Sequence, residues 1–190
     1  TLQGSRYATD TSLQPMGFLE KTIELNAEMY RSNQRLTATH PYSSKWYTWP
    51  LMARPIFYWV KDTARIYLIG NPLVWWGSSV AVLVMFLTLA FSGIRTMGRT
   101  PLIMTGAWLM NIVPFIGISR VMFLYHYFTA LIWAILMLAY LVDRSHHTRK
   151  AVIGISLVTL ALFIYFAPLS YGLPLTDNAY NNRVWFSSWR

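Results

Sequence analysis

Four runs of almost uninterrupted apolar residues fill the last two-thirds of this 190-residue chain. Each run is close to the roughly 20 residues that an α-helix needs to cross the hydrocarbon core of a bilayer. The runs are Leu73–Phe91, Pro101–Ile118, Val121–Val142 and Ala151–Ala167. Only 12% of the residues are charged and 55% are apolar, so a soluble domain of this size lacks the polar surface that it needs. The sequence therefore predicts an all-α integral membrane protein with about four transmembrane helices.

The second run is the least regular of the four, because Asn111 and Pro114 interrupt it. Pro114 leaves a backbone carbonyl without its helical partner, and inside a bilayer a neighbouring helix or a hydroxyl has to satisfy that carbonyl. This interruption favours a packed bundle over isolated helices.

The basic residues of the short loops predict how the helices are oriented. Those of the first and third loops are Arg95, Arg99, Arg144, Arg149 and Lys150, whereas the loop between the second and third runs carries only Arg120. The positive-inside rule places the first and third loops in the cytoplasm. We therefore expect an outer-face segment at 1–70, a four-helix bundle at 71–168 and an outer-face tail at 169–190. The net charge of +9 is spread between apolar runs, which predicts membrane lipids rather than nucleic acid as partners.

The outer-face segment combines an amphipathic helix with an aromatic-rich loop. Apolar residues recur at helical spacing between Pro15 and Leu36, and glutamates line another face. The stretch from His40 to Pro50 then breaks the helical pattern at both of its prolines. Alternating residues at 56–60 and 66–69 permit two short strands.

The aromatic-rich loop has two interpretations. Tryptophan and tyrosine are common at the membrane interface, where the ring is buried and its polar tip meets water. The loop, however, also places His40, Ser44 and Arg54 among these rings. Such a mixture suits a sugar or a lipid phosphate, and an arginine can bind a phosphate with two N–H groups.

Arg120 and His126 form a second group at the outer end of the third run. An ionisable residue in a membrane span is a functional hypothesis by default; the alternative is a snorkelling arginine and a histidine that is hydrogen-bonded within the bundle. No second histidine or carboxylate lies at ligand spacing on that helix, so we expect no metal site. Haem or pigment at His126 is an alternative, and otherwise no cofactor is predicted.

The seven carboxylates do not form a catalytic pair in the sequence. They are Asp10, Glu20, Glu24, Glu28, Asp62, Asp143 and Asp177. The three glutamates occupy one helix face, Asp143 is cytoplasmic in the predicted topology, and Asp62 has Lys61 and Arg65 as neighbours for ion pairing. We therefore predict no catalytic residue, and the absence of cysteine excludes disulfides and thiolate metal sites.

Several blocks of the chain, taken together, resemble the C-terminal region of bacterial protein O-mannosyltransferases. These blocks are His40-Pro-Tyr-Ser-Ser-Lys-Trp-Tyr-Thr-Trp-Pro-Leu-Met-Ala-Arg-Pro55, Ile69-Gly-Asn-Pro-Leu-Val-Trp-Trp76, Ser119-Arg-Val-Met-Phe-Leu-Tyr-His-Tyr127 and the tail around Trp185 and Trp189. The resemblance implies a GT-C glycosyltransferase of the inner membrane. Such enzymes transfer mannose from a polyprenyl phosphate to Ser or Thr of exported proteins.

By the same resemblance, certain residues lie near the donor or the acceptor. They are His40, Ser44, Trp46, Trp49, Arg54, Arg120 and His126. The catalytic acidic motif of the family lies in its first outer loop, and these 190 residues contain no counterpart. We thus expect a C-terminal module that is inactive without an N-terminal half. The alternative is a non-catalytic subunit that reuses the module in a larger membrane complex, for example a respiratory or photosynthetic one; a transporter is a weaker third reading.

Overall fold

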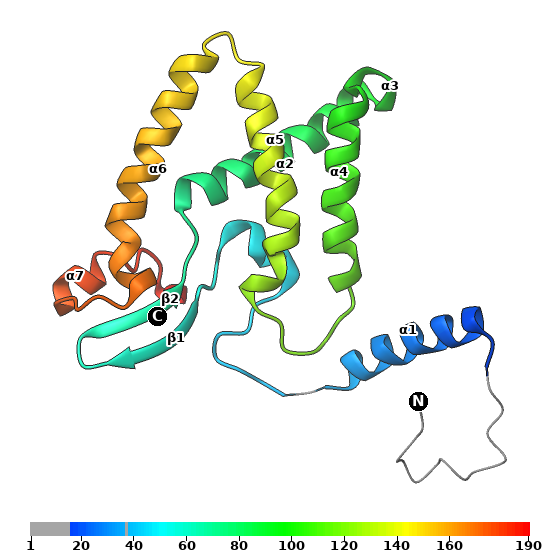
Figure 1. Cartoon of the computed structure of the whole chain (residues 1–190), viewed down its shortest axis with the longest axis horizontal. Coiled ribbons are helices and arrows are strands. Elements are labelled where there is room, and N and C mark those ends of the chain that lie inside the picture. The colour runs from blue at the N-terminus through cyan, green and yellow to red at the C-terminus, as the bar shows by residue number, and fades with distance from the viewer. Residues whose placement is uncertain (1–15, 37) are drawn as a thin grey trace. The chain divides into compact units, whose positions relative to one another are not determined.

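The computed structural model describes residues 16–36 and 38–190, which belong to two units. The first unit contains helix α1 (Phe18–Arg35) and residues 118–120; α1 is the blue helix of Figure 1. None of its residues is buried, and Glu28 lies 3.8 Å from Arg31 and 3.9 Å from Arg35. The predicted amphipathic helix is confirmed, with Pro15 outside the described residues.

The second unit, residues 38–117 and 121–190, is mostly helical. Its α-helices are α2 (Pro72–Ser92), α3 (Ile94–Met97), α4 (Arg99–Ile112), α5 (Phe128–Asp143), α6 (Thr148–Tyr171) and α7 (Asp177–Asn181). Its 3₁₀ turns are η1 (Trp46–Leu51), η2 (Val113–Phe115), η3 (Leu124–Tyr127) and η4 (Ser187–Trp189). The two strands are β1 (Ile56–Lys61) and β2 (Ala64–Leu68).

Three helical segments of the described residues are long and apolar enough to cross a membrane: Pro72–Ser92, Leu124–Asp143 and Thr148–Tyr171. The prediction of a helical membrane protein is confirmed, but the count of four is not. The second predicted run forms α4, which has 14 residues and therefore a length of about 21 Å. It ends at Ile112, and Pro114 lies in the 3₁₀ turn that follows, because proline cannot continue the helical hydrogen bonding.

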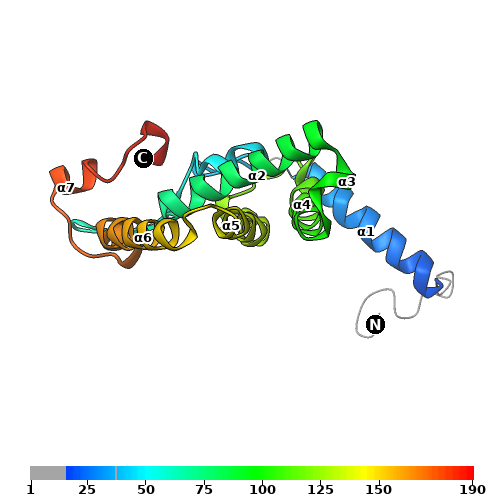
Figure 2. The same ribbon diagram turned by 90° about the horizontal axis from the view of Figure 1, so that it is seen from above.

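Helix α5 packs against both α2 and α4 (Figures 1 and 2). Its contact surface is made of small or flexible residues, since Ala130, Ala134 and Met137 are fully buried. On the facing helix, a β-carbon at Gly77 would touch Leu138 at 3.4 Å. Small residues at such contacts let helix backbones approach closely within a membrane.

Strands β1 and β2 form an antiparallel hairpin with a bulge at Tyr58, near the two segments that the alternating pattern predicted. Asp62 turns the chain with a φ of 52°. The hairpin packs against α6, and Gly172 ends that helix in the left-handed conformation with a φ of 66°. A β-carbon at Gly172 would lie 2.8 Å from Ile66 Cγ1, so both backbone conformation and space require glycine there.

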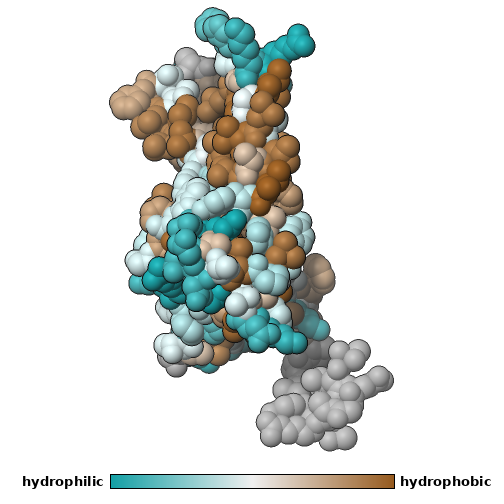
Figure 3. Space-filling model, turned by 90° about the vertical axis from the view of Figure 1, so that its left-hand side faces the viewer, coloured by the Kyte–Doolittle hydropathy of each residue, from teal (hydrophilic) through white to brown (hydrophobic). Residues whose placement is uncertain are grey.

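Figure 3 shows apolar side chains gathered in one band over this unit, with hydrophilic atoms on either side of it. Helix α6 contributes much of the exposed apolar surface and buries only Phe166 and Leu169. The connections before α4 and between α5 and α6 lie at one end of the unit, and the hairpin and C-terminus lie at the other. The two loops that were predicted to be cytoplasmic thus lie at the same end.

Candidate functional site

Five consecutive backbone carbonyls of the aromatic loop, here residues 40–55, accept hydrogen bonds from side chains far away in the sequence. Helix α2 provides three donors: Trp75 Nε1 to Trp49 O at 2.8 Å, Ser79 Oγ to Pro50 O at 2.5 Å and Trp76 Nε1 to Leu51 O at 2.9 Å. The C-terminal tail provides two more: Trp189 Nε1 to Met52 O at 3.0 Å and Ser188 Oγ to Ala53 O at 2.6 Å. We call these five bonds the carbonyl clamp. Because buried carbonyls need partners, the clamp selects one loop conformation.

The clamped segment has an irregular backbone that the sequence alone explains only in part. Pro50 lies within the turn η1, and Met52 follows with a left-handed φ of 50°. Both Trp49 and Met52 are fully buried, and the N–H of Gly70 donates to Met52 Sδ at 3.1 Å. A non-glycine residue in this conformation persists only where its surroundings determine it.

Trp49 contacts two other predicted site residues, Ser44 and His126. Its Nε1 donates to Ser44 Oγ at 3.0 Å, and its ring is stacked on His126, with centroids 5.8 Å apart and planes 9° apart. Ser44 is itself fixed by its N–H, which donates to Met122 O at 2.8 Å. Ser44, Trp49 and His126 therefore come together, although 82 positions separate the first from the last.

His126 lies in the turn η3, at the start of the apolar segment Leu124–Asp143 and before α5 begins at Phe128. Its second neighbour is Tyr125, stacked at 4.5 Å, and its Nδ1 lies 3.0 Å from Phe123 O and 3.2 Å from Phe123 N. The imidazole is held between two rings, which supports the reading of a histidine hydrogen-bonded within the fold.

His40 extends the same set of rings toward the surface. It meets the edge of Phe123 at 5.1 Å, and its Nδ1 accepts from the N–H of Tyr42 at 3.2 Å. Phe123 in turn stacks on Tyr125 at 5.6 Å. We call this set the ring cluster; its members are His40, Trp49, Phe115, Phe123, Tyr125 and His126. His40 is exposed while Trp49 is buried, so the cluster leads from the surface into the core.

Arg54 follows the carbonyl clamp directly and is half-buried. Its guanidinium carbon lies 5.6 Å from the ring centre of Tyr42, which also touches His40 at 6.0 Å. Among residues 16–36 and 38–190, no acceptor lies within hydrogen-bond distance of the buried Nε of Arg54. A buried charged N–H without an acceptor is costly, so this position suits an anion.

The two remaining predicted residues are Trp46 and Arg120. The ring of Trp46 packs edge-on against Tyr47 at 5.6 Å and is half-buried. Arg120 is half-buried and belongs with residues 118–120 to the first unit, which the structure describes separately. The expectation that Arg120 lies near the donor or the acceptor therefore remains a prediction.

The described carboxylates are exposed, and two of them form ion pairs, Glu28 with Arg31 and Arg35 and Asp177 with Arg65. Asp177, and not Asp62, is the ion-pair partner of Arg65, at 3.6 Å, which corrects the expectation from sequence neighbours. Asp62 is exposed at the hairpin turn and Asp143 is exposed at the end of α5. Asp10 lies outside the described residues.

A group that the sequence did not reveal joins the hairpin to α7. The guanidinium of Arg65 lies 4.1 Å from the ring centre of Tyr180, and the hydroxyls of Tyr180 and Tyr67 share a hydrogen bond of 2.7 Å. Burial, followed by this hydrogen bond, raises the pKa of Tyr67 above its ordinary value. No pattern of neighbouring residues predicts these contacts, because they join segments more than 110 residues apart.

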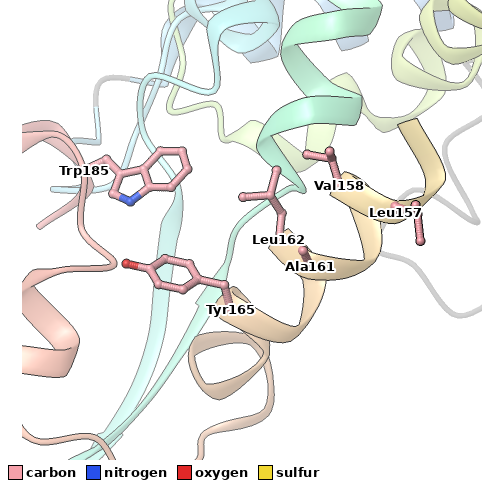
Figure 4. A pocket seen from close by; sticks show the side chains of 6 residues that line it. All are labelled: Leu157, Val158, Ala161, Leu162, Tyr165 and Trp185. Carbon is pink, nitrogen blue, oxygen red and sulfur yellow. The ribbon is translucent and has the colours of Figure 1, made fainter. Parts of the chain in front are cut away.

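A groove on α6 is chemically different from the aromatic loop. It encloses about 500 Å³ and is lined by Leu157, Val158, Ala161, Leu162, Tyr165 and Trp185. Figure 4 shows these side chains along one side of α6, with the Trp185 ring near that of Tyr165. The only hydroxyl among them, that of Tyr165, already donates to Asn182 O at 2.6 Å. The groove therefore suits a hydrocarbon chain and offers little to a sugar.

Comparison with known proteins agrees with this geometry. The family model of the C-terminal four-transmembrane region of protein O-mannosyltransferases matches residues 18–189. The chain belongs to this family. As a C-terminal region of a protein O-mannosyltransferase, it carries the aromatic loop, the hairpin and the tail described above within the matched residues.

Individual mannosyltransferases match over nearly the whole chain. Dolichyl-phosphate-mannose–protein mannosyltransferase 1 of Candida albicans is 29% identical over 90% of this chain and 22% of its own length. Protein O-mannosyltransferase 1 of Drosophila pseudoobscura is 30% identical over 92% of this chain and 23% of its own length. The solved structure of the S. cerevisiae Pmt1-Pmt2 complex bound to the sugar donor matches with a TM-score of 0.73 at 25% identity, over 94% of this chain and 28% of that one. The chain thus spans about a quarter of the relatives that it matches.

Proposed function

We propose that this region binds the phosphate of a polyprenyl-phosphate-mannose donor at Arg54, on the outer face of the membrane. The proposal rests on Arg54, because its buried Nε has no hydrogen-bond acceptor among the described residues. The chain also belongs to a family of mannosyltransferases. Relatives are named for the dolichyl-phosphate mannose that they use. A guanidinium donates two parallel N–H bonds to a phosphate, so the residue fits the donor's charged group.

The neighbouring residues take different parts in this proposal. His40 is exposed beside Tyr42, near Arg54, and would face the sugar or the acceptor peptide. Trp49 has no exposed surface, so it would hold Ser44 and His126 in place instead of stacking on a sugar. Trp46 and Arg120 would approach the donor from their own segments.

Transfer itself would need a group that the ring cluster does not supply. The bond between mannose C1 and the phosphate oxygen breaks, a Ser or Thr hydroxyl bonds to C1, and a positioned base takes the hydroxyl proton. The described carboxylates are exposed or ion-paired and are not in the ring cluster. We therefore expect this region alone to bind the donor without transferring mannose to an acceptor peptide.

Binding of a polyprenyl phosphate to the chain in nanodiscs tests the proposal. Arg54→Ala should weaken binding about tenfold or more, because a hydrogen bond to a charged group contributes about 1.5–3 kcal/mol. Arg120→Ala should weaken it too if both residues reach one phosphate. Arg95→Ala, at the opposite end of the second unit, is the control and should bind normally. Equal binding by wild type and Arg54→Ala would reject Arg54 as the phosphate ligand.

The proposed orientation has its own test, because the chain contains no cysteine. A single cysteine replaces either Lys61, exposed on the hairpin, or Arg149, exposed after the α5–α6 connection. A membrane-impermeant maleimide added to intact bacterial cells should label the Lys61→Cys protein and spare the Arg149→Cys protein. The reverse pattern would invert the proposed topology and place Arg54 in the cytoplasm.

We also propose that the region works beside another membrane subunit or an N-terminal half. The similar yeast structure is a complex of Pmt1 and Pmt2, and α1 exposes apolar side chains such as Leu19 and Ile23. Purification in mild detergent followed by mass spectrometry should recover a mannosyltransferase polypeptide at fixed stoichiometry. Recovery of respiratory or photosynthetic subunits would instead support the alternative of a reused module.

A further inference from the structure

The C-terminal tail supplies the last two donors of the carbonyl clamp, and both act just before Arg54. Trp189 Nε1 donates to Met52 O at 3.0 Å, and Ser188 Oγ donates to Ala53 O at 2.6 Å. The three donors of α2 reach only as far as Leu51 O. Among the clamp donors, those of the tail are thus the ones that hold the carbonyls of Met52 and Ala53, directly before Arg54.

The tail is itself anchored independently of the aromatic loop. Trp189 is buried and its ring lies 6.1 Å from that of Trp185 and 6.3 Å from that of Phe166 in α6. Just before them, Arg183 Nε donates to Tyr165 O at 2.7 Å. Because the tail is fixed to α6, it can hold the loop in a set position relative to the membrane helices.

Met52 explains why the loop needs such a support. It has a left-handed φ of 50°, a conformation that a non-glycine residue leaves unless its neighbours hold it. A change of φ and ψ at Met52 would rotate the following residues, and Arg54 would move relative to Tyr42 and His40. The tail bonds at Met52 O and Ala53 O oppose this rotation.

We propose that Trp189 and Ser188 are positioning residues, which hold the loop so that Arg54 meets the phosphate of the polyprenyl donor. The inference rests on the proposed function of Arg54, and it assigns the tail a role in donor binding through the backbone of residues 52 and 53. The tail side chains do not touch the donor themselves.

Four variants separate this role from general packing. Trp189→Phe keeps an aromatic ring and removes the N–H donor, and Ser188→Ala removes the hydroxyl. Ser188→Thr keeps a hydroxyl donor and should restore what Ser188→Ala loses. Ser187→Ala is the control, because it removes an exposed hydroxyl from the same tail. Arg54→Ala reports on the proposed function.

Two measurements on the intact chain in nanodiscs complete the test: hydrogen–deuterium exchange of the peptide covering residues 46–54, and the Kd for a polyprenyl phosphate. Trp189→Phe and Ser188→Ala should speed exchange in this peptide and weaken binding about tenfold, as expected when a buried carbonyl loses its donor. Ser188→Thr and Ser187→Ala should behave like wild type in both measurements.

Each of three other results would reject either the positioning role of the tail or the proposed function of Arg54. If both tail variants exchange and bind like wild type while Arg54→Ala loses binding, the positioning role is wrong and the proposed function stands. If the tail variants speed exchange but bind normally, the tail orders the loop without serving the donor, and the inference is equally rejected. If Arg54→Ala itself binds normally, the proposed function fails, whatever the tail variants do.

Discussion

The two ends of the second unit are built in contrasting ways. At the end with the aromatic loop, five successive carbonyls are held by tryptophan and serine side chains. At the opposite end, short connections join the helices, Gly93 and Gly98 turn the chain at φ values of 79° and 78°, and basic residues such as Arg95 and Arg144 are exposed.

The difference shows which end has to keep a fixed shape. For the exposed basic connections, the positive-inside rule depends on charge and does not require one conformation. A site that recognises a phosphate needs its arginine in one place, and rigid support reduces the cost of ordering it on binding. The carbonyl clamp provides that support, and the following substitutions test whether the two ends differ as their contacts indicate.

The largest difference is expected between two glycine-to-alanine substitutions. A β-carbon at Gly70 would overlap the buried ring of Trp75, whereas nothing lies within 4 Å of one at Gly154 in α6. Gly70→Ala should lower the free energy of unfolding by about 3 kcal/mol through overpacking. Gly154→Ala should raise it by up to about 1 kcal/mol through helix propensity. Unfolding by SDS titration in mixed micelles measures both, and equal effects would contradict the rigid contact at Gly70.

A smaller effect is expected for the clamp bond donated by Trp75. Trp75→Phe keeps a ring but removes the 2.8 Å bond to Trp49 O, which then accepts from the N–H of Met52 at 2.9 Å. The free energy of unfolding should fall by about 1.5 kcal/mol, at the upper end of the roughly 0.5–1.5 kcal/mol that one hydrogen bond contributes, because this bond is buried. Trp46→Phe is the matched control on the loop itself, because the half-buried Trp46 ring packs edge-on against Tyr47 and is not part of the clamp. A loss of equal size in both variants would attribute the effect to ring size rather than to the clamp.

The sequence predicts the parts of this fold whose signal is local. Runs of apolar residues indicate α2 and α6 almost to their ends, and alternation indicates the hairpin. The two middle runs are predicted less well. Helix α4 ends at Ile112, before Pro114. The run from Val121 begins with an irregular segment and a 3₁₀ turn before α5. Hydropathy counts apolar residues and is insensitive to such breaks.

The candidate site, in contrast, depends on pairs that are distant in the sequence. Trp189 donates to a carbonyl 137 residues away, and His126 stacks on Trp49; no spacing rule relates these positions. Family resemblance indicated the same residues, but only coordinates show that Trp49 is buried support and that Arg54 lies beside Tyr42. The sequence offers one signal of the clamp: tryptophans are concentrated in the aromatic loop, in the first turns of α2 and in the tail.

The smallest effect concerns the hairpin at the clamped end, where Tyr67 and Tyr180 share a hydrogen bond of 2.7 Å. Tyr67→Phe should lower the free energy of unfolding at pH 7 by about 1 kcal/mol, and Tyr47→Phe, an exposed control at the same end, should leave it unchanged.

Burial and the bond to Tyr180 raise the pKa of Tyr67, so its phenol stays neutral in the folded state at a pH where the unfolded chain already releases the proton. The stabilising contribution is therefore complete below the ordinary tyrosine pKa of about 10 and is lost as the pH rises above it. Unfolding measured between pH 8 and pH 12 should show wild type losing stability more steeply than Tyr67→Phe above pH 10. Parallel curves would mean that Tyr67 ionises as readily in the folded protein as in the unfolded one, and that the hairpin is less firmly packed against α7 than its contacts indicate.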